Sequence, residues 1–544
     1  MKNPQKKFLD FHYPVFIPSA IIVLLFVILA IVYGEPLSDF FLEVRNQLYD
    51  KIGWFFILTV NLLLIAAIFI AFSKFGKIKL GGRSATPDFS NFSWYSMLFS
   101  AGMGIGLIFY SVAEPIQHFA TPPIPVEGDV NAAKQAFKFT FLHYGLHPWA
   151  VYGMIALAFA FFTFNRKLPL TVRSLFAPLL GRKIHGVIGH IVDTLAVIAC
   201  LFGLATTLGF GAQQVGSGFN FLFGLENNVT TQIIFISITT ILATLSIVSG
   251  LDKGVKVLSE LNVRIAIGFM LLMLILGPTV FLLDSFVENI GLYAQNLLEL
   301  GTYTEVYAES KWQNNWTIFY WAWWIAWSPF VGIFIARISK GRTIREFLMG
   351  VVILPSLLSF LWFTIFGSSA IYLELNELAD ISTAVSADIS TALFEMLKHY
   401  PLTSIMSFVG IVLVISFFVT SSDSGSLVVD FITTGGKLDA PVATRIFWAL
   451  VEGLLAIALL VGGGLSTLQT AVMIAALPFA IILLVMTYSL FIGLKRERVK
   501  YLRHRVARNL RVQSSQMERF MEDFDNDDED EDEEDDDDIE IISK

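Results

Sequence analysis

The sequence predicts an all-α integral membrane protein with twelve transmembrane helices, and three observations lead to this prediction. The 544 residues are 55% hydrophobic and only 15% charged, with a mean hydropathy of +0.67, whereas soluble domains carry about 25% charged residues. Twelve apolar runs are close to or above the roughly 20 residues that a helix needs to cross a bilayer. The loops between these runs alternate in charge, as loops on the two sides of a membrane do.

The apolar runs give the expected order of the helices along the chain. They lie at about 15–33, 53–73, 93–113, 138–163, 187–223, 231–250, 263–283, 316–337, 347–371, 403–431, 444–463 and 466–493. The fifth run is too long for one upright crossing, so we expect it to tilt or to extend past the membrane.

The charges of the loops predict the orientation. Loops rich in Lys and Arg, such as SKFGKIKLGGR, should face the cytoplasm, and they alternate with neutral or acidic loops through all twelve runs. Both termini then lie in the cytoplasm, because residues 1–14 hold three lysines and the last run is followed by KRERVKYLRHRVARNLR. No small-residue cleavage site follows the first run, so we interpret it as a membrane span and not as a signal peptide.

The formal charge of −9 combines two parts of opposite sign. Residues 522–544 carry a net charge of −15, which leaves +6 for the preceding 521 residues. The one cysteine, Cys200, cannot form an internal disulfide, and no Cys/His spacing suggests a metal site. No nucleophile and base stand in a pattern typical of an enzyme, so we expect neither catalysis nor a nucleic-acid partner.

A glycine-rich stretch interrupts the third run. FSAGMGIGLIFYSVAEP, at 99–115, places Gly102, Gly104 and Gly106 at alternate positions. Each glycine weakens a helix by about 1 kcal/mol relative to alanine, so three glycines in this spacing favour unwound backbone. Such backbone is tolerated at membrane depth only where it lines a cavity, and there its N–H groups can hold an anion or its carbonyls a cation. Close helix packing through small residues explains this stretch, taken alone, equally well.

Six of the 11 tryptophans fall within residues 312–327. At 100° per residue, one face of a helix there is aromatic. It carries Trp316, Tyr320, Trp323 and Trp327, with Trp324 beside them. We expect Pro329 to break this helix. An interfacial aromatic belt would sit at the end of a span, whereas this cluster runs through the first half of one. Aromatic faces beside a helix break suit a quaternary ammonium group, because each cation–π contact is worth up to about 2 kcal/mol.

Polar residues interrupt the tenth run. SFFVTSSDSGSLVVD, at 416–430, holds five hydroxyl side chains and Asp423 within seven positions. Such groups are costly at membrane depth unless they are used, and hard oxygen ligands suit a sodium ion. Bonding of the hydroxyls to carbonyls of their own helix is the alternative, and it explains one or two hydroxyls more readily than five.

Four segments together resemble the betaine/carnitine/choline transporter family. They are GMGIGLIFYSVAEP, GLHPWAVY, FYWAWWIAWSPFVGIFIARISKGRT and VTSSDSGS, and the resemblance runs from about residue 50 to 460. It implies a leucine-transporter-type fold, in which two five-helix halves, 92–283 and 316–494, form an inverted repeat preceded by two extra helices in 15–91. Breaks in the third and eighth spans would occupy corresponding positions of such a repeat. The resemblance also implies a homotrimer.

The resemblance implies an aromatic substrate cage. Residue by residue, the cage falls on Trp149, Tyr152, Trp323, Trp324 and Trp327, with Tyr144, Gly104 and Gly106 beside it. Tyr144 stands where betaine carriers usually have tryptophan, which leaves the shape of the cage open. Gly106 stands where some choline carriers have aspartate. The lack of that carboxylate favours a zwitterion that brings its own, such as glycine betaine.

The resemblance also implies sodium sites. The main site falls on the hydroxyls of Thr420 and Ser421 and on backbone oxygens at Ser100, Met103 and Phe417. A second, weaker candidate involves Thr206 or Thr207 near Phe330. Sodium-independent exchangers of the family lack the polar set of the main site, so its presence favours sodium coupling. No cofactor is expected apart from sodium as the coupling ion.

Three segments lie outside the two helical halves. The loop at 284–315 should be periplasmic, and its stretch 286–301 has helical apolar spacing that suits a surface helix or an ordered loop helix. Residues 495–521 predict a cytoplasmic amphipathic helix, and the eight Lys and Arg within 495–512 suit anionic lipid. The acidic block at 522–544 should be disordered. It would compete with lipid for the basic helix, and salt would screen that contact, unless the tail has no regulatory role.

Taken together, these features predict a sodium symporter of the bacterial inner membrane that imports a betaine-like compatible solute. Sodium would assemble the substrate site in an outward-facing state, and rigid halves would then rock to release both inside. Two alternatives share the fold: a sodium-independent betaine or carnitine exchanger, and a carrier of choline, ectoine or dimethylsulfoniopropionate. A membrane osmosensor whose transport is incidental is an alternative of another class.

Overall fold

The computed structural model describes residues 10–102, 104–248, 252–308, 310–437 and 441–539. Regular structure in these residues is helical, apart from an isolated β-bridge between Lys79 and Thr343. The predicted all-α class is confirmed. The chain forms two units, one ending at Leu490 and one beginning at Phe491.

The helices follow one another with short connections. The first half of the chain contains α1 (Tyr13–Tyr33), α2 (Glu35–Phe72), α3 (Asn91–Gly102), α4 (Ile105–Ala120), α5 (Asp129–Tyr144), α6 (Leu146–Ala160), α7 (Ala177–Leu180), α8 (Val187–Phe223), α9 (Val229–Val248) and α10 (Asp252–Leu276). The second half contains α11 (Thr279–Thr302), α12 (Phe319–Ile338), α13 (Ile344–Leu375), α14 (Ile381–Ala387), α15 (Ala392–Leu397), α16 (Thr403–Thr433), α17 (Val442–Val461) and α18 (Gly464–Ile539). Two π-helical turns, η2 (Phe161–Asn165) and η5 (Asn314–Ile318), follow α6 and precede α12.

The predicted spans fall on these helices. By length and composition, ten helical segments of the described residues can cross a membrane, and α10 with α11 makes an eleventh as a pair bent by 113°. The remaining predicted run, 93–113, is divided between α3 and α4. Some helices extend beyond the apolar runs: α2 begins at Glu35 and α5 at Asp129. Hydropathy marks only the apolar part of a helix, so it does not detect the polar turns that continue it.

The third run is broken where the glycines predicted it. Helix α3 ends at Gly102, Gly104 is extended with φ −157° and ψ −179°, and α4 begins at Ile105. The expected break at Pro329 is absent, because α12 continues through this residue. Proline lacks the N–H that would bond to the carbonyl of Ile325, and the Ser328 hydroxyl donates to that carbonyl instead, at 2.7 Å.

The fourth run contains a break that we did not predict, at Gly145 between α5 and α6. A Cβ at Gly145 would lie 2.4 Å from the Phe141 carbonyl oxygen and 2.7 Å from the Tyr293 hydroxyl, so only glycine fits. Tyr293 belongs to α11, and its hydroxyl accepts the N–H of Leu146 at 3.1 Å. The break at Gly145 is therefore stabilised by a contact with α11. No pattern in the sequence around Gly145 indicates this contact.

Helix α11 is the helix expected at 286–301, and it is longer than predicted. It is bent away from α10 by 113°. Val280, Val287 and Leu298 are each more than 70% exposed, so α11 presents apolar side chains outward. This supports the surface-helix interpretation of the segment.

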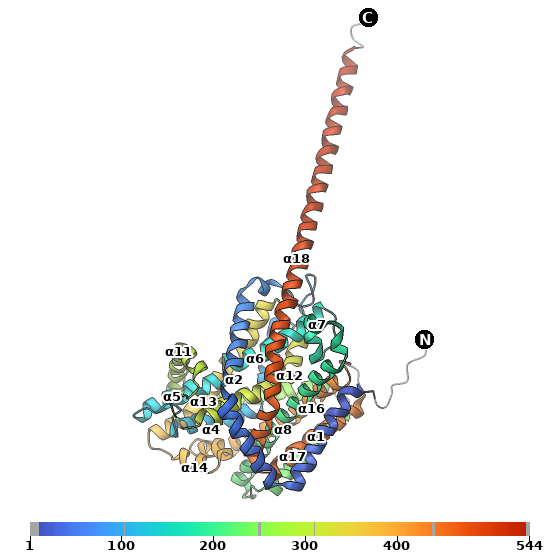
Figure 1. The fold of residues 1–544 in the computed structure, drawn as a ribbon. Coiled ribbons are helices and arrows are strands. Elements are labelled where there is room, and N and C mark those ends of the chain that lie inside the picture. The colour runs from blue at the N-terminus through green and yellow to red at the C-terminus, as the bar shows by residue number, and fades with distance from the viewer. Residues whose placement is uncertain (1–9, 103, 249–251, 309, 438–440, 540–544) are drawn as a thin grey trace. The chain divides into compact units, whose positions relative to one another are not determined.

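Helix α12 forms the interior of the first unit. It packs against α6 and α8, while α13 packs on α4 and α6, and α16 packs on α8 (Figure 1). Helices α1 and α17 contact each other and also pack against α8. The tryptophan-rich segment is thus surrounded by the helices that carry the other three motifs.

The second unit is the continuation of α18. The apolar side chains Val499, Leu502, Val506 and Leu510 are exposed, as a lipid-facing stripe requires. The structure differs from the disorder expected for 522–544, because α18 continues as helix to Ile539, and residues 540–544 lie outside the described part. An existing helix can be extended residue by residue without forming a new nucleus. The charge of the acidic block alone therefore did not predict that α18 continues through it.

Arg342 ties the start of α3 to the start of α13. Its guanidinium bonds Asn91, Glu346 and, at 2.9 Å, the carbonyl of Phe89, and it lies 4.7 Å from the Trp94 ring centre. We expect Arg342→Met to destabilise the protein by about 1–3 kcal/mol, because hydrogen bonds from a charged group that join α3 to α13 are lost. The thermal midpoint of the purified protein measures this. Lys340→Met, which removes an exposed pair with Asp88, is the control, and equal midpoints for the two variants would contradict the role of Arg342.

Candidate functional site

A small cavity lies at the break between α3 and α4. Its volume is about 60 Å³. The lining residues come from the unwound stretch and from α4, α5, α6, α8 and α12, and are Gly104, Ile105, Gly106, Leu107, Tyr144, Tyr152, Thr207, Trp323, Trp324 and Trp327. The unwound stretch, the tyrosines of α5 and α6 and the tryptophans of α12 therefore meet at one place.

Trp324 is the centre of the aromatic wall. Its ring centre lies 4.8 Å from that of Tyr152 and 5.9 Å from that of Tyr144. Trp149 is fully buried and packs behind this wall, 5.8 Å from Trp324 and 5.6 Å from Tyr152. Trp149 therefore supports the cage residues, while the other predicted cage residues line the cavity.

The aromatic face predicted for α12 divides into two parts. Trp323 and Trp327 line the cavity, whereas Trp316 packs 4.5 Å from the ring of His118. Trp321, which is not part of that face, is buried beside His147. Only the second half of the aromatic face thus belongs to the cavity.

Trp323 lies close against the unwound backbone. A Cβ at Gly106 would be 2.5 Å from Cη2 of Trp323, so the ring occupies the space that any side chain at Gly106 would need. The indole N–H of Trp323 donates to the Thr207 hydroxyl at 3.1 Å. These contacts explain glycine at position 106 and fix the orientation of the ring.

Side chains from other helices donate to carbonyls at the start of α4, next to the break. The Tyr144 hydroxyl donates to the Gly106 carbonyl at 3.3 Å and lies 3.2 Å from the Tyr320 hydroxyl. The Gln214 amide donates to the Ile108 carbonyl at 3.4 Å. A tryptophan in place of Tyr144 has no hydroxyl to share between these partners, so the departure from the family pattern has a structural use.

A buried polar network, which sequence reasoning missed, stands behind Tyr320. The Tyr320 hydroxyl donates to Glu114, whose carboxyl also contacts Nδ1 of His143 at 2.6 Å and Nε2 of His118 at 3.3 Å. Nε2 of His143 lies 2.8 Å from the Thr317 hydroxyl. In the sequence, the only indication of this network is the acidic residue Glu114 directly after the apolar third run.

Glu114, His118 and His143 offer ligand atoms within 4.8 Å of one another. These atoms are already engaged in hydrogen bonds within the network. We therefore interpret the cluster as a network that positions Tyr320 and, through it, Tyr144.

The main sodium residues are partly described. The Thr420 hydroxyl is 3.2 Å from the Phe417 carbonyl of its own helix, which is the back-bonding foreseen as the alternative. Ser421 is half-buried beside it, Ser100 lies within α3, and Met103 lies outside the described residues. The grouping of these residues around one ion stays a prediction.

The residues of the second sodium candidate have separate partners. Thr207 lines the aromatic cavity, and the Thr206 hydroxyl lies 2.8 Å from the Phe202 carbonyl and 3.0 Å from that of Leu468. The Phe330 ring packs 5.3 Å from Trp327. The structure thus places Thr207 with the predicted substrate residues.

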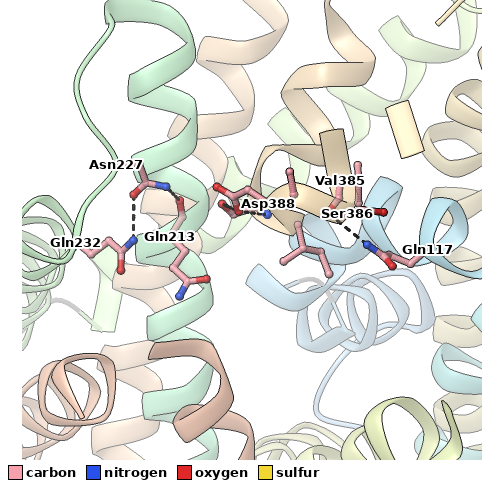
Figure 2. Close-up of a pocket in the computed structure, with 10 residues that line it drawn as sticks. Gln117, Gln213, Asn227, Gln232, Val385, Ser386 and Asp388 are labelled. Carbon is pink, nitrogen blue, oxygen red and sulfur yellow. Dashed lines mark hydrogen bonds between the residues drawn. The ribbon is translucent and has the colours of Figure 1, made fainter. Parts of the chain in front are cut away.

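A second cavity, of about 410 Å³, is larger and polar. It is lined by Gln117, Gln213, Asn227, Gln232, Val385, Ser386, Ala387, Asp388, Ile389 and Ser390. Figure 2 shows Asn227 between Gln232, whose amide donates to it at 3.0 Å, and the Gln213 carbonyl at 3.3 Å. Across the cavity, Gln117 donates to the Val385 carbonyl at 3.3 Å. Helices α4 and α8 contribute residues to both cavities.

Comparison with known proteins decides the family. The model of the betaine/carnitine/choline family transporters matches residues 14–499. The chain belongs to the betaine/carnitine/choline transporter family. The family consists of multi-span membrane transporters, so this member is a transporter and not an enzyme, as the sequence predicted.

Several members of the betaine/carnitine/choline transporter family are similar over most of their length. A glycine betaine/proline/choline transporter of Vibrio parahaemolyticus is 44% identical over 90% of this chain and 91% of its own. The glycine betaine transporter of Acinetobacter baylyi is 43% identical over 91% of this chain and 75% of its own. The glycine betaine transporter OpuD of Bacillus subtilis is 44% identical over 87% and 92%.

The fit between Gly106 and Trp323 can be tested by one methyl group. We expect Gly106→Ala to weaken binding of glycine betaine by roughly 10- to 100-fold, because overpacking a filled site costs about 1–3 kcal/mol. Titration of tryptophan fluorescence in the purified protein measures this. Gly291→Ala in α11, where a Cβ meets nothing within 4 Å, is the control. If Gly106→Ala bound glycine betaine as tightly as the wild type, the position of the Trp323 ring would not matter for binding.

Proposed function

We propose that this transporter imports a quaternary-ammonium compatible solute, with glycine betaine as the first candidate, together with sodium across the bacterial inner membrane. The observation that carries the proposal is the cavity of two tyrosines and three tryptophans at the unwound stretch. Aromatic faces attract an onium group most strongly where water is excluded. The names of the similar glycine betaine transporters support the same substrate class.

The cavity also suits the negative end of a zwitterion. The indole N–H groups of Trp324 and Trp327 are buried and have no hydrogen-bond partner among the described residues. A carboxylate is the strongest acceptor that such donors can find. At Gly106, where a carboxylate would counter a cationic substrate, the Trp323 ring fills the space. A ligand that brings its own carboxylate therefore fits better than a simple cation.

The polar cavity supplies the approach to the aromatic cavity. Helix α4 contributes Gly106 to the aromatic cavity and Gln117 to the polar one, and α8 contributes Thr207 and Gln213 in the same way. In the orientation predicted by the loop charges, residues 385–390 face outward. The polar cavity would then receive the substrate, and the small volume of the aromatic cavity corresponds to a site closed around a compact group.

Sodium coupling rests on the polar set of α16. Thr420 is half-buried, and the Asn262 amide lies 3.5 Å from its hydroxyl. An ion there would replace the helix carbonyl as the partner of the hydroxyl and would draw α16 toward the unwound part of α3. This links occupancy by sodium to the shape of the substrate cavity. A homotrimer is proposed on the family resemblance alone.

Two alternatives remain within the family, and one outside it. A Vibrio relative is named for glycine betaine, proline and choline, so a broader substrate range is the first. A sodium-independent exchanger is the second, because the Thr420 hydroxyl already has partners in its own helix. An osmosensor whose transport is incidental would show no net uptake.

Uptake of labelled glycine betaine into proteoliposomes tests the proposal. An inward sodium gradient should drive accumulation. Trp324→Ala should weaken apparent affinity about 30-fold through loss of roughly 2 kcal/mol of cation–π attraction. Thr420→Ala should raise the sodium concentration needed for half-maximal uptake about tenfold, because it removes ~1.4 kcal/mol of sodium-binding free energy. The substrate affinity at saturating sodium should stay unchanged. Uptake that is indifferent to sodium would favour the exchanger, and absence of uptake would favour another substrate.

Osmotic regulation is a separate proposal that depends on the tail. Deleting 522–544 removes a net charge of −15 and leaves the basic helix free to bind anionic lipid. We expect the deleted protein to lose activation by rising internal salt, since no acidic competitor remains to be screened. Uptake at several salt concentrations, in liposomes with and without anionic lipid, measures this. Unchanged activation would mean that the tail is a solvated segment without a regulatory role.

A further inference from the structure

Glu452 is a carboxylic acid in the interior of a membrane-spanning helix. It lies near the middle of α17 and its side chain is 0% exposed. Neither of its carboxyl oxygens has a hydrogen-bond partner among the described residues. An isolated carboxylate in such surroundings would lose its hydration without compensation, and ionisable groups inside membrane spans mark functional sites by default.

The polar groups beside Glu452 come from α16. The Ser422 hydroxyl is next to the Glu452 carboxyl, outside hydrogen-bond geometry, and has no other partner in the described part of the chain. Asp423, the following residue, also acts on Glu452. Its own oxygens accept hydrogen bonds from Ser246 at 2.8 Å and from Arg445 at 3.1 Å. The guanidinium of Arg445 is therefore engaged by Asp423 and does not neutralise Glu452.

Glu452 shares its lack of partners with a second buried acid, Asp430, whose carboxyl oxygens also have no hydrogen-bond partner among the described residues. A protein interior tolerates such a carboxyl group only if it takes up a proton or pairs with a cation.

Among the described residues, the side chains that the other packed helices bring toward Glu452 are uncharged. Helix α8 brings the thiol of Cys200 near Glu452, and α9 brings Thr240 against the neighbouring Gly453. Helix α1 has no acidic or basic residue between Tyr13 and Tyr33. Glu452 is thus faced by hydroxyl groups, a thiol and a second carboxyl.

We propose that Glu452 is a proton-binding site of the transport cycle. In the conformation described, it is neutral and can turn its O–H toward the Ser422 hydroxyl. It loses the proton when movement of α16 against α17 admits water. A proton needs one acceptor atom, whereas a metal cation needs several oxygens around it, so the pair of Glu452 and Ser422 suits a proton better.

The position of Ser422 links this proton to transport. Ser422 comes directly after the two proposed sodium ligands Thr420 and Ser421 on α16. If α16 moves when sodium binds or leaves, the surroundings of Glu452 therefore change as well. The link to transport rests on the proposed function. The protonation itself does not, because it can be measured without substrate.

Infrared spectroscopy of the full-length purified protein measures the protonation. Protonated carboxylic acids absorb separately from carboxylates. At neutral pH, where exposed glutamates are ionised, the wild type should show a protonated-acid band that loses intensity in Glu452→Gln. Glu288→Gln, which changes an exposed glutamate paired with Lys134, should leave the band intact. If Glu452→Gln does not fold, Ser422→Ala removes the acceptor and should shift the band. A band unchanged in Glu452→Gln, or in Ser422→Ala where that variant has to replace it, overturns the proposal.

Uptake against pH measures the link to transport. Wild-type glycine betaine uptake should vary with pH, and Glu452→Gln, which stays neutral at every pH, should lose this dependence. Identical pH profiles in the two proteins overturn the link. If the wild type shows the band but takes up no glycine betaine at any pH, the proposed substrate fails while the proton site stands. If uptake is normal but the band does not respond to Glu452→Gln, the proton site fails while the proposed function stands.

Discussion

The interruption of the third span is the constraint on which the rest of this structure depends, because unwound backbone at membrane depth is tolerated only where it lines a cavity. The glycines interrupt this span between α3 and α4. Just after the break, Tyr144 and Gln214 donate to the carbonyls of Gly106 and Ile108 at the start of α4. These contacts hold α5 and α8 against the start of α4.

The binding cavity follows from this solution. Because Gly106 has no side chain, the Trp323 ring can approach the unwound backbone, and Trp324 packs against Tyr144 and Tyr152 to form a wall of the remaining space. The Glu114 network holds Tyr320, which in turn contacts the Tyr144 hydroxyl. The aromatic cavity is in this way connected to an acid buried outside it. Removing one member would alter both the stability of the break and the shape of the cavity.

The sequence predicted those parts of the structure that depend on residues close together in the chain. Apolar runs and loop charges placed the helices, the glycines placed the break near residue 103, and the aromatic spacing placed Trp323 and Trp327 together. Contacts between residues far apart in the chain could not be predicted in this way. Pro329 does not break α12 because Ser328 satisfies the carbonyl of Ile325, and Gly145 is held by Tyr293 from α11. The partners of Glu114 at His143 and Tyr320 are far from it in sequence, and Glu452 shows its lack of partners only once α16 and α17 are packed.

We propose that the aromatic cavity recognises the positive charge of an onium group. The most direct measurement compares binding of glycine betaine with that of tert-butylacetate, in which carbon replaces the charged nitrogen and the shape is retained. Calorimetry on the purified protein, with sodium present, gives both affinities. We expect glycine betaine to bind far more tightly, since only its trimethylammonium group is attracted by the aromatic faces. Equal affinity for the two ligands would contradict it, because the cavity would then recognise shape and apolar surface without charge.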